Sequence, residues 1–307
     1  MTTIEWTEQT WNPTTGCDRI SLGCDNCYAL TMAKRLKGMG SAKYQNDGDP
    51  RTSGPGFGIT GHPDTLGEPL RWKKPRRVFV NSMSDLFHAR VTTGLITNVW
   101  KIMAATPQHT YQILTKRASR LAPVLAKVHA ELGLTEPLPN VWLGVSVESQ
   151  KYADLRIPGL LAAPAAVRFL SCEPLLGPVD LCGPVVPGRG RPKLTYWLDG
   201  RPGWGPDQTD DRGRVFQELA VGPRIDWVIV GGESGPGARP MDLAWAEQIA
   251  EQCQHSGTAV FVKQLGSVWA RDTTWGGKTV AGHGDTKGGS PSYWPAHLRI
   301  REYPTAA

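Results

Sequence analysis

The fold is decided by a rhythm that begins at Arg77-Val78-Phe79-Val80-Asn81-Ser82, a short apolar run rich in β-branched residues. A helical pattern over residues 93–105 follows it, and the alternation then repeats along the chain. Further strands are expected at 110–115, 140–146, 167–171, 226–231 and 259–263, and helices at 118–132, 150–157, 159–163 and 243–255. Short apolar runs that alternate with amphipathic helices indicate βα units around a parallel sheet.

A seventh strand is expected within residues 1–12, directly before a loop that carries three cysteines. Seven strands without a dinucleotide-binding fingerprint predict an α/β fold, a partial or complete βα (TIM-like) barrel over residues 1–265. Gly, Pro and Arg break the rhythm at 178–225, which predicts an irregular insert. Residues 266–307 have no clear period, and we expect a C-terminal extension packed on the barrel.

The composition indicates a globular protein, since 40% of the 307 residues are hydrophobic and 20% are charged. There is no apolar run of the roughly 18 residues that would indicate a transmembrane helix. The N-terminus also lacks the pattern of a signal peptide, so we expect a cytoplasmic protein with no membrane partner. The net charge of +6 is compatible with a nucleic-acid partner without requiring one.

Three of the six cysteines lie close together as Cys17-x6-Cys24-x2-Cys27. In a reducing compartment such a group is typical of metal binding or catalysis. The three thiolates can hold zinc with His88 or Cys172 as a fourth ligand, or three irons of a [4Fe–4S] cluster, or they can be ordinary buried cysteines. A structural zinc site usually brings a second pair of ligands, which is missing here, and this favours a cluster with one open iron.

Polar residues follow almost every expected strand. In a βα barrel the carboxyl ends of the strands meet at the active site, so these residues are expected to form one pocket. Any one of them alone is better explained as a helix cap. The members of this set are Ser82, Ser84, Asp85, His88, Lys116, Arg117, Ser146, Glu148, Cys172, Glu173, Glu233 and Lys263.

The cysteine loop resembles that of the radical S-adenosylmethionine enzymes, in which a three-cysteine loop follows the first strand of a βα barrel. The run Cys24-x-x-Cys27-Tyr28-Ala29 is similar to the branch that includes spore photoproduct lyase. The first gap has six residues instead of the common three, and Asn26 stands where most members carry an aromatic residue.

The whole chain also resembles a phage and prophage family of unknown function. The shared blocks are Thr10-Trp11-Asn12-Pro13, Gly16-Cys17, Gly23-Cys24-x-x-Cys27-Tyr28-Ala29, Ser84-Asp85-Leu86-Phe87-His88, Leu114-Thr115-Lys116-Arg117, Gly144-Val145-Ser146-Val147-Glu148 and Gly231-Gly232-Glu233-Ser234-Gly235. Gly231-Gly232-Glu233 spells a motif of the radical enzymes, but it follows the sixth expected strand instead of the second. We therefore interpret it as a substrate-side loop.

The resemblance implies a [4Fe–4S] cluster on Cys17, Cys24 and Cys27 and S-adenosyl-L-methionine as the second cofactor. The expected product of cofactor cleavage is a 5′-deoxyadenosyl radical that takes hydrogen from a substrate, with a nucleotide or DNA, either repaired or modified, as the favoured class. A flavodoxin- or ferredoxin-like protein would supply the electron.

The resemblance also implies roles for the polar strand ends. The expected cofactor-binding residues are Lys116 or Arg117 for the methionyl carboxylate, Ser82, Ser84 or Asp85 for the amino group, and Ser146 or Glu148 for the ribose. The expected catalytic residues are Cys172, Glu173 and Glu233.

Two other classes of protein stay open. The basic run at 71–77, together with Arg189 and Arg191, is compatible with a nucleic-acid-binding barrel that contains zinc or no metal. Carboxylates at strand ends, here Asp85, Glu173 and Glu233, are compatible with a barrel hydrolase whose cysteines are structural.

Overall fold

A computed structural model describes residues 4–183, 185–186, 193–194, 196–200, 208–216 and 222–305. Its centre is one seven-stranded sheet with the order β1-β4-β5-β6-β7-β12-β13, in which every neighbouring pair is parallel. The strands are β1 (Gln9–Trp11), β4 (Arg77–Val80), β5 (Thr110–Thr115), β6 (Val141–Ser146), β7 (Val167–Cys172), β12 (Trp227–Gly231) and β13 (Ala259–Gln264).

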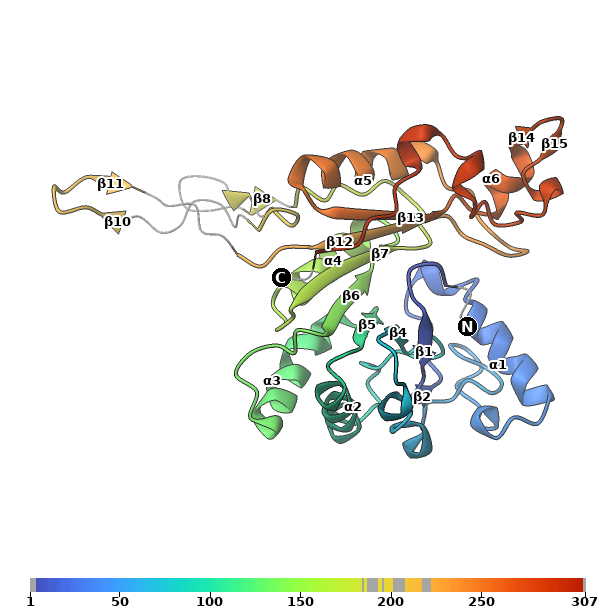
Figure 1. Ribbon diagram of the computed structural model, residues 1–307, viewed down its shortest axis with the longest axis horizontal. Coiled ribbons are helices and arrows are strands. Elements are labelled where there is room, and N and C mark those ends of the chain that lie inside the picture. Colours follow the sequence, from blue (N-terminus) through green and yellow to red (C-terminus); the bar gives the residue numbers. More distant parts are fainter. Residues whose placement is uncertain are drawn as a thin grey trace.

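The sheet curls into a half-barrel (Figure 1). Within the described residues no strand pairing joins its two edges, β1 and β13, so the barrel is open. All seven strands expected from the apolar runs are present, and the alternative of a complete barrel is excluded for this part of the chain.

Helices separate several of the strands along the chain. They are α1 (Tyr28–Gly38), α2 (Thr93–Ala105), α3 (Leu121–Leu132), α4 (Gln150–Leu161), α5 (Leu243–Ser256) and α6 (Ser267–Asp272). The sequence predicted two short helices where α4 forms one, because Pro158 normally interrupts a helix. In the structure Ala153, Ile157 and Leu160 are fully buried on one side of α4. This packing outweighs the loss of one backbone hydrogen bond at Pro158.

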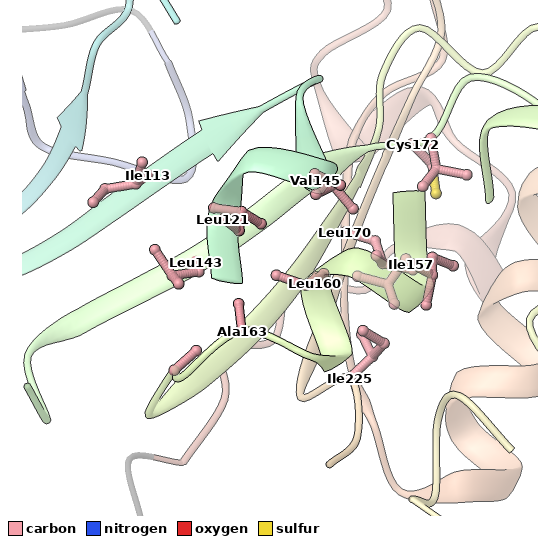
Figure 2. Packing of buried hydrophobic residues seen from close by; sticks show 14 of the residues in the cluster. Ile113, Leu121, Leu143, Val145, Ile157, Leu160, Ala163, Leu170, Cys172 and Ile225 are labelled. Atoms are coloured by element: carbon pink, nitrogen blue, oxygen red, sulfur yellow. The ribbon is translucent and has the colours of Figure 1, made fainter. Parts of the chain in front are cut away.

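The outer face of the sheet and the helices enclose the main apolar core. Figure 2 shows Leu143 and Val145 of β6 close to Leu121 of α3 and Leu160 of α4. Side chains alternate along a strand, so the residues between them face the other way. All six residues of β6 are buried, as expected for a strand that is covered on both faces.

The concave face of the sheet carries a second, largely aromatic cluster. Its members are Trp6, Phe79, Trp142, Val167, Phe169, Trp227, Ile229 and Phe261. Trp6 lies 4.8 Å from Phe79 and 6.2 Å from Trp227 between ring centroids, in edge-to-face arrangements. These rings come mainly from the first half of each strand, so they fill the half-barrel at its amino end and leave its carboxyl end open.

The chain after β13 returns along that strand. Val262 donates a backbone hydrogen bond to Ile300, and Glu302 donates one to Val260. Trp294 and Leu298 enter the main core. The return segment thus covers a sheet edge that would otherwise expose unpaired backbone groups.

The region of the predicted insert contains two short antiparallel pairs. They are β8 (Val185–Val186) with β9 (Lys193–Leu194), and β10 (Gln208–Thr209) with β11 (Val215–Phe216). Arg189 and Arg191 lie outside the described residues. Among the helices that the structure describes, none combines the length and hydrophobicity needed to span a bilayer.

The segment between α1 and β4 is irregular, as expected from its Gly and Pro content. It contains the short turns η2 (Ala42–Tyr44), η3 (Pro63–Thr65) and η4 (Pro69–Arg71), and β3 (Thr60–Gly61) pairs with β2 (Thr14–Thr15). The basic run at 71–77 ends at Arg77, the first residue of β4, so it lies at the amino end of the sheet.

Packing on the concave face predicts the effect of one methyl group. A Cβ atom added at Gly144 would lie 2.5 Å from ring atoms of Phe169. We expect Gly144→Ala to lower the free energy of unfolding by about 1–3 kcal/mol, since overpacking a dense core forces side chains out of their rotamers. Urea denaturation measures this change.

Gly94 provides the matched control. It lies in the first turn of α2, and a Cβ atom there would meet nothing within 4 Å. Gly94→Ala should leave stability unchanged or raise it by up to about 1 kcal/mol. Equal stability of Gly144→Ala and the wild type would show that the concave face is not packed in this way.

Candidate functional site

A cavity of about 290 Å³ opens at the carboxyl end of the sheet. The cysteine loop forms one wall, and residues at or just after the carboxyl ends of β4, β5, β6, β7, β12 and β13 form the others. Of the residues predicted from the sequence, twelve line it: Cys17, Cys24, Cys27, Ser82, Ser84, Asp85, Lys116, Arg117, Ser146, Glu173, Glu233 and Lys263. The structure therefore gathers most of the polar strand ends into one place.

Cys172 is an exception that corrects the sequence prediction. Ser171 lines the cavity, and because side chains alternate along a strand, Cys172 faces the outer core. Figure 2 shows it among the core residues. Complete burial raises the pKa of its thiol well above the ordinary value. Cys172 is therefore neither a cavity residue nor positioned as a fourth zinc ligand.

His88 also lies away from the cavity lining. Its Nε2 is 2.9 Å from the Asp18 carboxylate, which also accepts hydrogen bonds from Thr52, Ser53 and Arg90. These contacts brace the start of the cysteine loop. The two residues that the sequence offered as a fourth zinc ligand thus have other roles.

Glu148 lies behind the wall of the cavity, where it is fully buried. Its Oε2 is 2.6 Å from Nη1 of Arg156, and its Oε1 is 2.9 Å from Nζ of Lys116. The Ser21 hydroxyl donates to Oε1 at 2.7 Å. This carboxylate therefore holds the cysteine loop instead of facing a ribose.

Arg156 was missed by the sequence reasoning. It belongs to α4, is 2% exposed, and also donates to the backbone oxygen of Ser146 at 2.7 Å. A signal was present, because an arginine among Ala153, Ile157 and Leu160 on the buried side of a helix requires a partner.

Asp85 and Arg117 form a second buried pair. Arg117 Nη1 donates to Asp85 Oδ2 at 2.8 Å, and Asp85 also accepts from the Thr115 hydroxyl at 2.7 Å and from the backbone of Phe87 and Lys116. The guanidinium also donates to the Asp18 backbone oxygen at 3.1 Å and to Cys17 Sγ at 3.4 Å. Both residues, which the sequence predicted as ligand-binding, already have partners within the chain.

A third contact joins the cysteine loop to the loop after β12. Glu233 accepts hydrogen bonds from Nε and Nη2 of Arg239, at 2.9 and 2.6 Å. The Asn26 amide donates to Glu233 at 3.0 Å and to the Gly237 backbone oxygen at 2.8 Å. Arg239 also donates to the Leu22 backbone oxygen at 2.9 Å. These contacts give Asn26 a role in joining the two loops, at a position where most radical S-adenosylmethionine enzymes carry an aromatic residue.

The two serines after β4 also have partners in the chain. The Ser84 hydroxyl donates to the Gly16 backbone oxygen at 2.7 Å, and Ser82 exchanges hydrogen bonds with the Asn12 side chain. The ion pair between Lys263 Nζ and Glu173 Oε1, at 2.9 Å, faces the cavity on its far wall. Trp6, Phe79 and Leu114 supply apolar lining.

Each thiol of the cysteine loop has a different environment. Cys17 Sγ contacts Arg117, and Cys24 Sγ lies 3.6 Å from the Ser21 hydroxyl. Cys27 is the N-cap of α1, and the backbone N–H groups of Ala29 and Leu30 lower its pKa. Burial has the larger effect on Cys27 and raises its pKa. Burial, followed by the Asp85 carboxylate, also raises the pKa of Cys17 to about 12, despite the opposing effect of Arg117.

The donor chemistry of this loop fits a thiolate-bound metal group, since all three thiols line one cavity. As folded, no set of three or more His, Cys, Asp and Glu side chains in the described part of the chain is arranged to hold a metal ion. Binding of such a group requires the thiolates, so it would release the protons of the thiols. The position of His88 and Cys172 outside the cavity fits a cluster with an open iron better than a closed zinc site.

Fold and site together define an α/β half-barrel protein with a cysteine-lined polar pocket at the carboxyl end of its sheet. The chain belongs to the family described as "Protein of unknown function (DUF5131)", whose profile matches residues 1–289. No curated protein matches it, and no solved structure does.

The Glu148 contacts predict a dependence of stability on pH. Burial alone would raise the pKa of this carboxyl, but Lys116, Arg156 and Ser21 outweigh it and lower the pKa from 4.5 to about 2. The pKa is lower in the folded than in the unfolded chain, so the ionised carboxylate stabilises the fold above about pH 4.5. This contribution, on the order of 3 kcal/mol, is lost as the pH falls toward 2.

Glu148→Gln removes this titration. We therefore expect the difference in unfolding free energy between wild type and variant to shrink steadily from pH 5 to pH 2 in urea denaturation experiments. A difference that stays constant over this range would contradict the assigned ion pairs.

Proposed function

We propose that the protein is a radical S-adenosylmethionine enzyme that holds a [4Fe–4S] cluster on Cys17, Cys24 and Cys27. The observation that supports this most is that the three thiols, on a loop after the first strand, line one cavity at the carboxyl end of a curled parallel sheet. When bound, such a cluster supplies the electron that cleaves S-adenosylmethionine into methionine and a 5′-deoxyadenosyl radical.

In this proposal, residues of the cavity wall bind the methionyl group. Lys116 and Lys263 each have a carboxylate partner, and an ammonium group has three donors, so each keeps donors for an anionic group of the ligand. Glu173 accepts from the ligand's amino group. Arg117 and Asp85, bonded to each other, act on the cysteine loop instead.

The apolar lining has a separate role in the proposal. Trp6 and Phe79 are at most 8% exposed and close the cavity toward the amino end of the sheet. They exclude water from the reacting atoms, which protects a radical from side reactions. Both rings also offer a surface on which a planar base packs.

The size of the cavity bears on the substrate. Pockets for small ligands usually measure about 300–1,000 Å³, so a cavity of about 290 Å³ leaves no room for a large substrate beside the cofactors. The substrate in this proposal therefore presents a single group at the mouth, as a nucleotide within DNA would. Support for DNA comes from the net charge of +6 and from the resemblance to phage proteins. The basic run at 71–77 does not support a DNA substrate, because it lies at the end of the sheet opposite the cavity.

Metal analysis of the anaerobically purified and reconstituted protein is the first test. We expect about four irons per chain with a brown chromophore. Cys24→Ala should lose most of the iron. Cys182→Ala is the matched control and should keep it, because Cys182 is an exposed cysteine outside the loop.

The second measurement is the formation of 5′-deoxyadenosine after reduction of the loaded protein in the presence of S-adenosylmethionine, with and without DNA. Absence of this product from a fully loaded protein would contradict radical chemistry. Stoichiometric zinc in place of iron would favour the zinc-containing alternative. A metal-free protein whose hydrolase activity requires Glu173 would favour the third class.

A further inference from the structure

We infer that Arg117 sets the reduction potential of the cluster by donating a charged hydrogen bond to the sulfur of Cys17. This inference rests on the proposed function, and it concerns a residue that the sequence assigned to the methionyl carboxylate. It makes Arg117 a residue that tunes the metal group through its ligand.

The contact is direct. Arg117 Nη1 lies 3.4 Å from Cys17 Sγ, within the range of a hydrogen bond to sulfur, and Nη2 donates to the backbone oxygen of Asp18 at 3.1 Å. The guanidinium thus binds both Cys17, the proposed cluster ligand, and Asp18, the residue after it. A displacement of the Cys17 loop would break both bonds.

Asp85 fixes the orientation of the guanidinium. Its carboxylate accepts from Arg117 at 2.8 Å and from the hydroxyl of Thr115 and the backbone of Phe87 and Lys116. With these four donors the carboxylate has little freedom to rotate. Asp85 is therefore a positioning residue that keeps Nη1 directed at the sulfur.

The pair is also shielded from water, since the Arg117 and Asp85 side chains are 11% and 7% exposed. Solvent screens a buried charge much less than an exposed one, so the guanidinium acts on the sulfur at nearly full strength. Because arginine stays protonated at every physiological pH, its electrostatic effect on the sulfur does not change with pH.

The direction of the effect follows from charge. Reduction adds one electron to the cluster, and a positive charge with an N–H donor at a ligand sulfur stabilises the more negative state. Hydrogen bonds to the sulfurs are among the factors that set cluster potentials. Arg117 should therefore raise the potential and make the cluster easier to reduce.

The other two thiols have weaker electrostatic support in the described residues. Cys24 Sγ lies near a neutral hydroxyl, that of Ser21, and Cys27 lies at the N-terminus of α1, where Lys116 acts on it through charge without a hydrogen bond to the sulfur. Arg117 places a full positive charge on one sulfur. The three ligands of the cluster are therefore not equivalent.

The test is a redox titration of the anaerobically reconstituted protein with dithionite, followed by electron paramagnetic resonance of the reduced cluster. Arg117→Gln removes the charge and keeps a short polar side chain. At the wild-type midpoint potential we expect its ratio of reduced to oxidised cluster to fall at least tenfold, which corresponds to about 59 mV for one electron. The iron content reports separately whether the cluster is loaded.

Arg117→Lys and Arg90→Met complete the set. Lysine keeps the charge but cannot reach Asp85, the Asp18 oxygen and the sulfur together. The cluster potential of Arg117→Lys should therefore fall between those of Arg117→Gln and the wild type. Arg90 is 54% exposed and binds the Asp18 carboxylate at 2.8 Å instead of a sulfur. For Arg90→Met, the ratio of reduced to oxidised cluster at the wild-type midpoint potential should stay within twofold of the wild-type ratio.

Wild-type potential in a fully loaded Arg117→Gln protein would overturn the inference and leave the proposed function intact. If that variant does not load, Arg117→Lys decides, and an unchanged potential overturns the inference. If Arg90→Met shifts the potential as far as Arg117→Gln, general surface charge explains the effect and the inference is wrong. A wild type that loads no cluster contradicts the proposed function itself.

Discussion

The buried Glu148 carboxylate is the interaction on which the arrangement of the site depends. It joins α4 through Arg156, the end of β5 through Lys116 and the cysteine loop through Ser21. Two cations and a hydroxyl compensate for the cost of burying its charge. The same carboxylate leaves no room for a side chain at Gly23, where a Cβ atom would lie 2.4 Å from Oε1. The loop is therefore held against the sheet by the hydrogen bond from Ser21 to Glu148 and by the close packing of Gly23 on the same carboxylate.

Two further contacts hold the cysteine loop from other directions. Arg117 reaches it from the end of β5, and Arg239 with Glu233 reaches it from the loop after β12. Each contact joins residues about 100 or more positions apart in the chain. A loop with little regular structure of its own is thus ordered by the strand ends around it. The aromatic cluster on the concave face supports those ends from below.

The strands and most helix positions could be predicted from the sequence, because short apolar runs report directly which segments are buried. The single helix α4 could not, since local rules end a helix at Pro158 and only tertiary packing of Ile157 and Leu160 carries it through. The sequence placed Cys172 in the cavity because it comes directly after the strand expected at 167–171. The alternation of side chains along that strand instead directs Cys172 into the outer core. Arg156 and Arg239 were not predicted, although Glu148 and Glu233 lie only eight and six positions away, because each pair forms across a bend of the chain whose geometry only the fold sets.

By itself, the sequence determined the βα rhythm, the three cysteines on one loop and the polar residues that gather at one end of the sheet. These are local properties, which depend on hydrophobic pattern and spacing. Only the tertiary structure decided which polar residues face the cavity and which are bonded to each other behind its wall. Ion pairs such as Asp85 with Arg117 form between side chains that the fold brings together, and their geometry depends on strand register and burial. For that reason the contacts of Arg117 with Asp85 and with the sulfur of Cys17 became visible only in the structure.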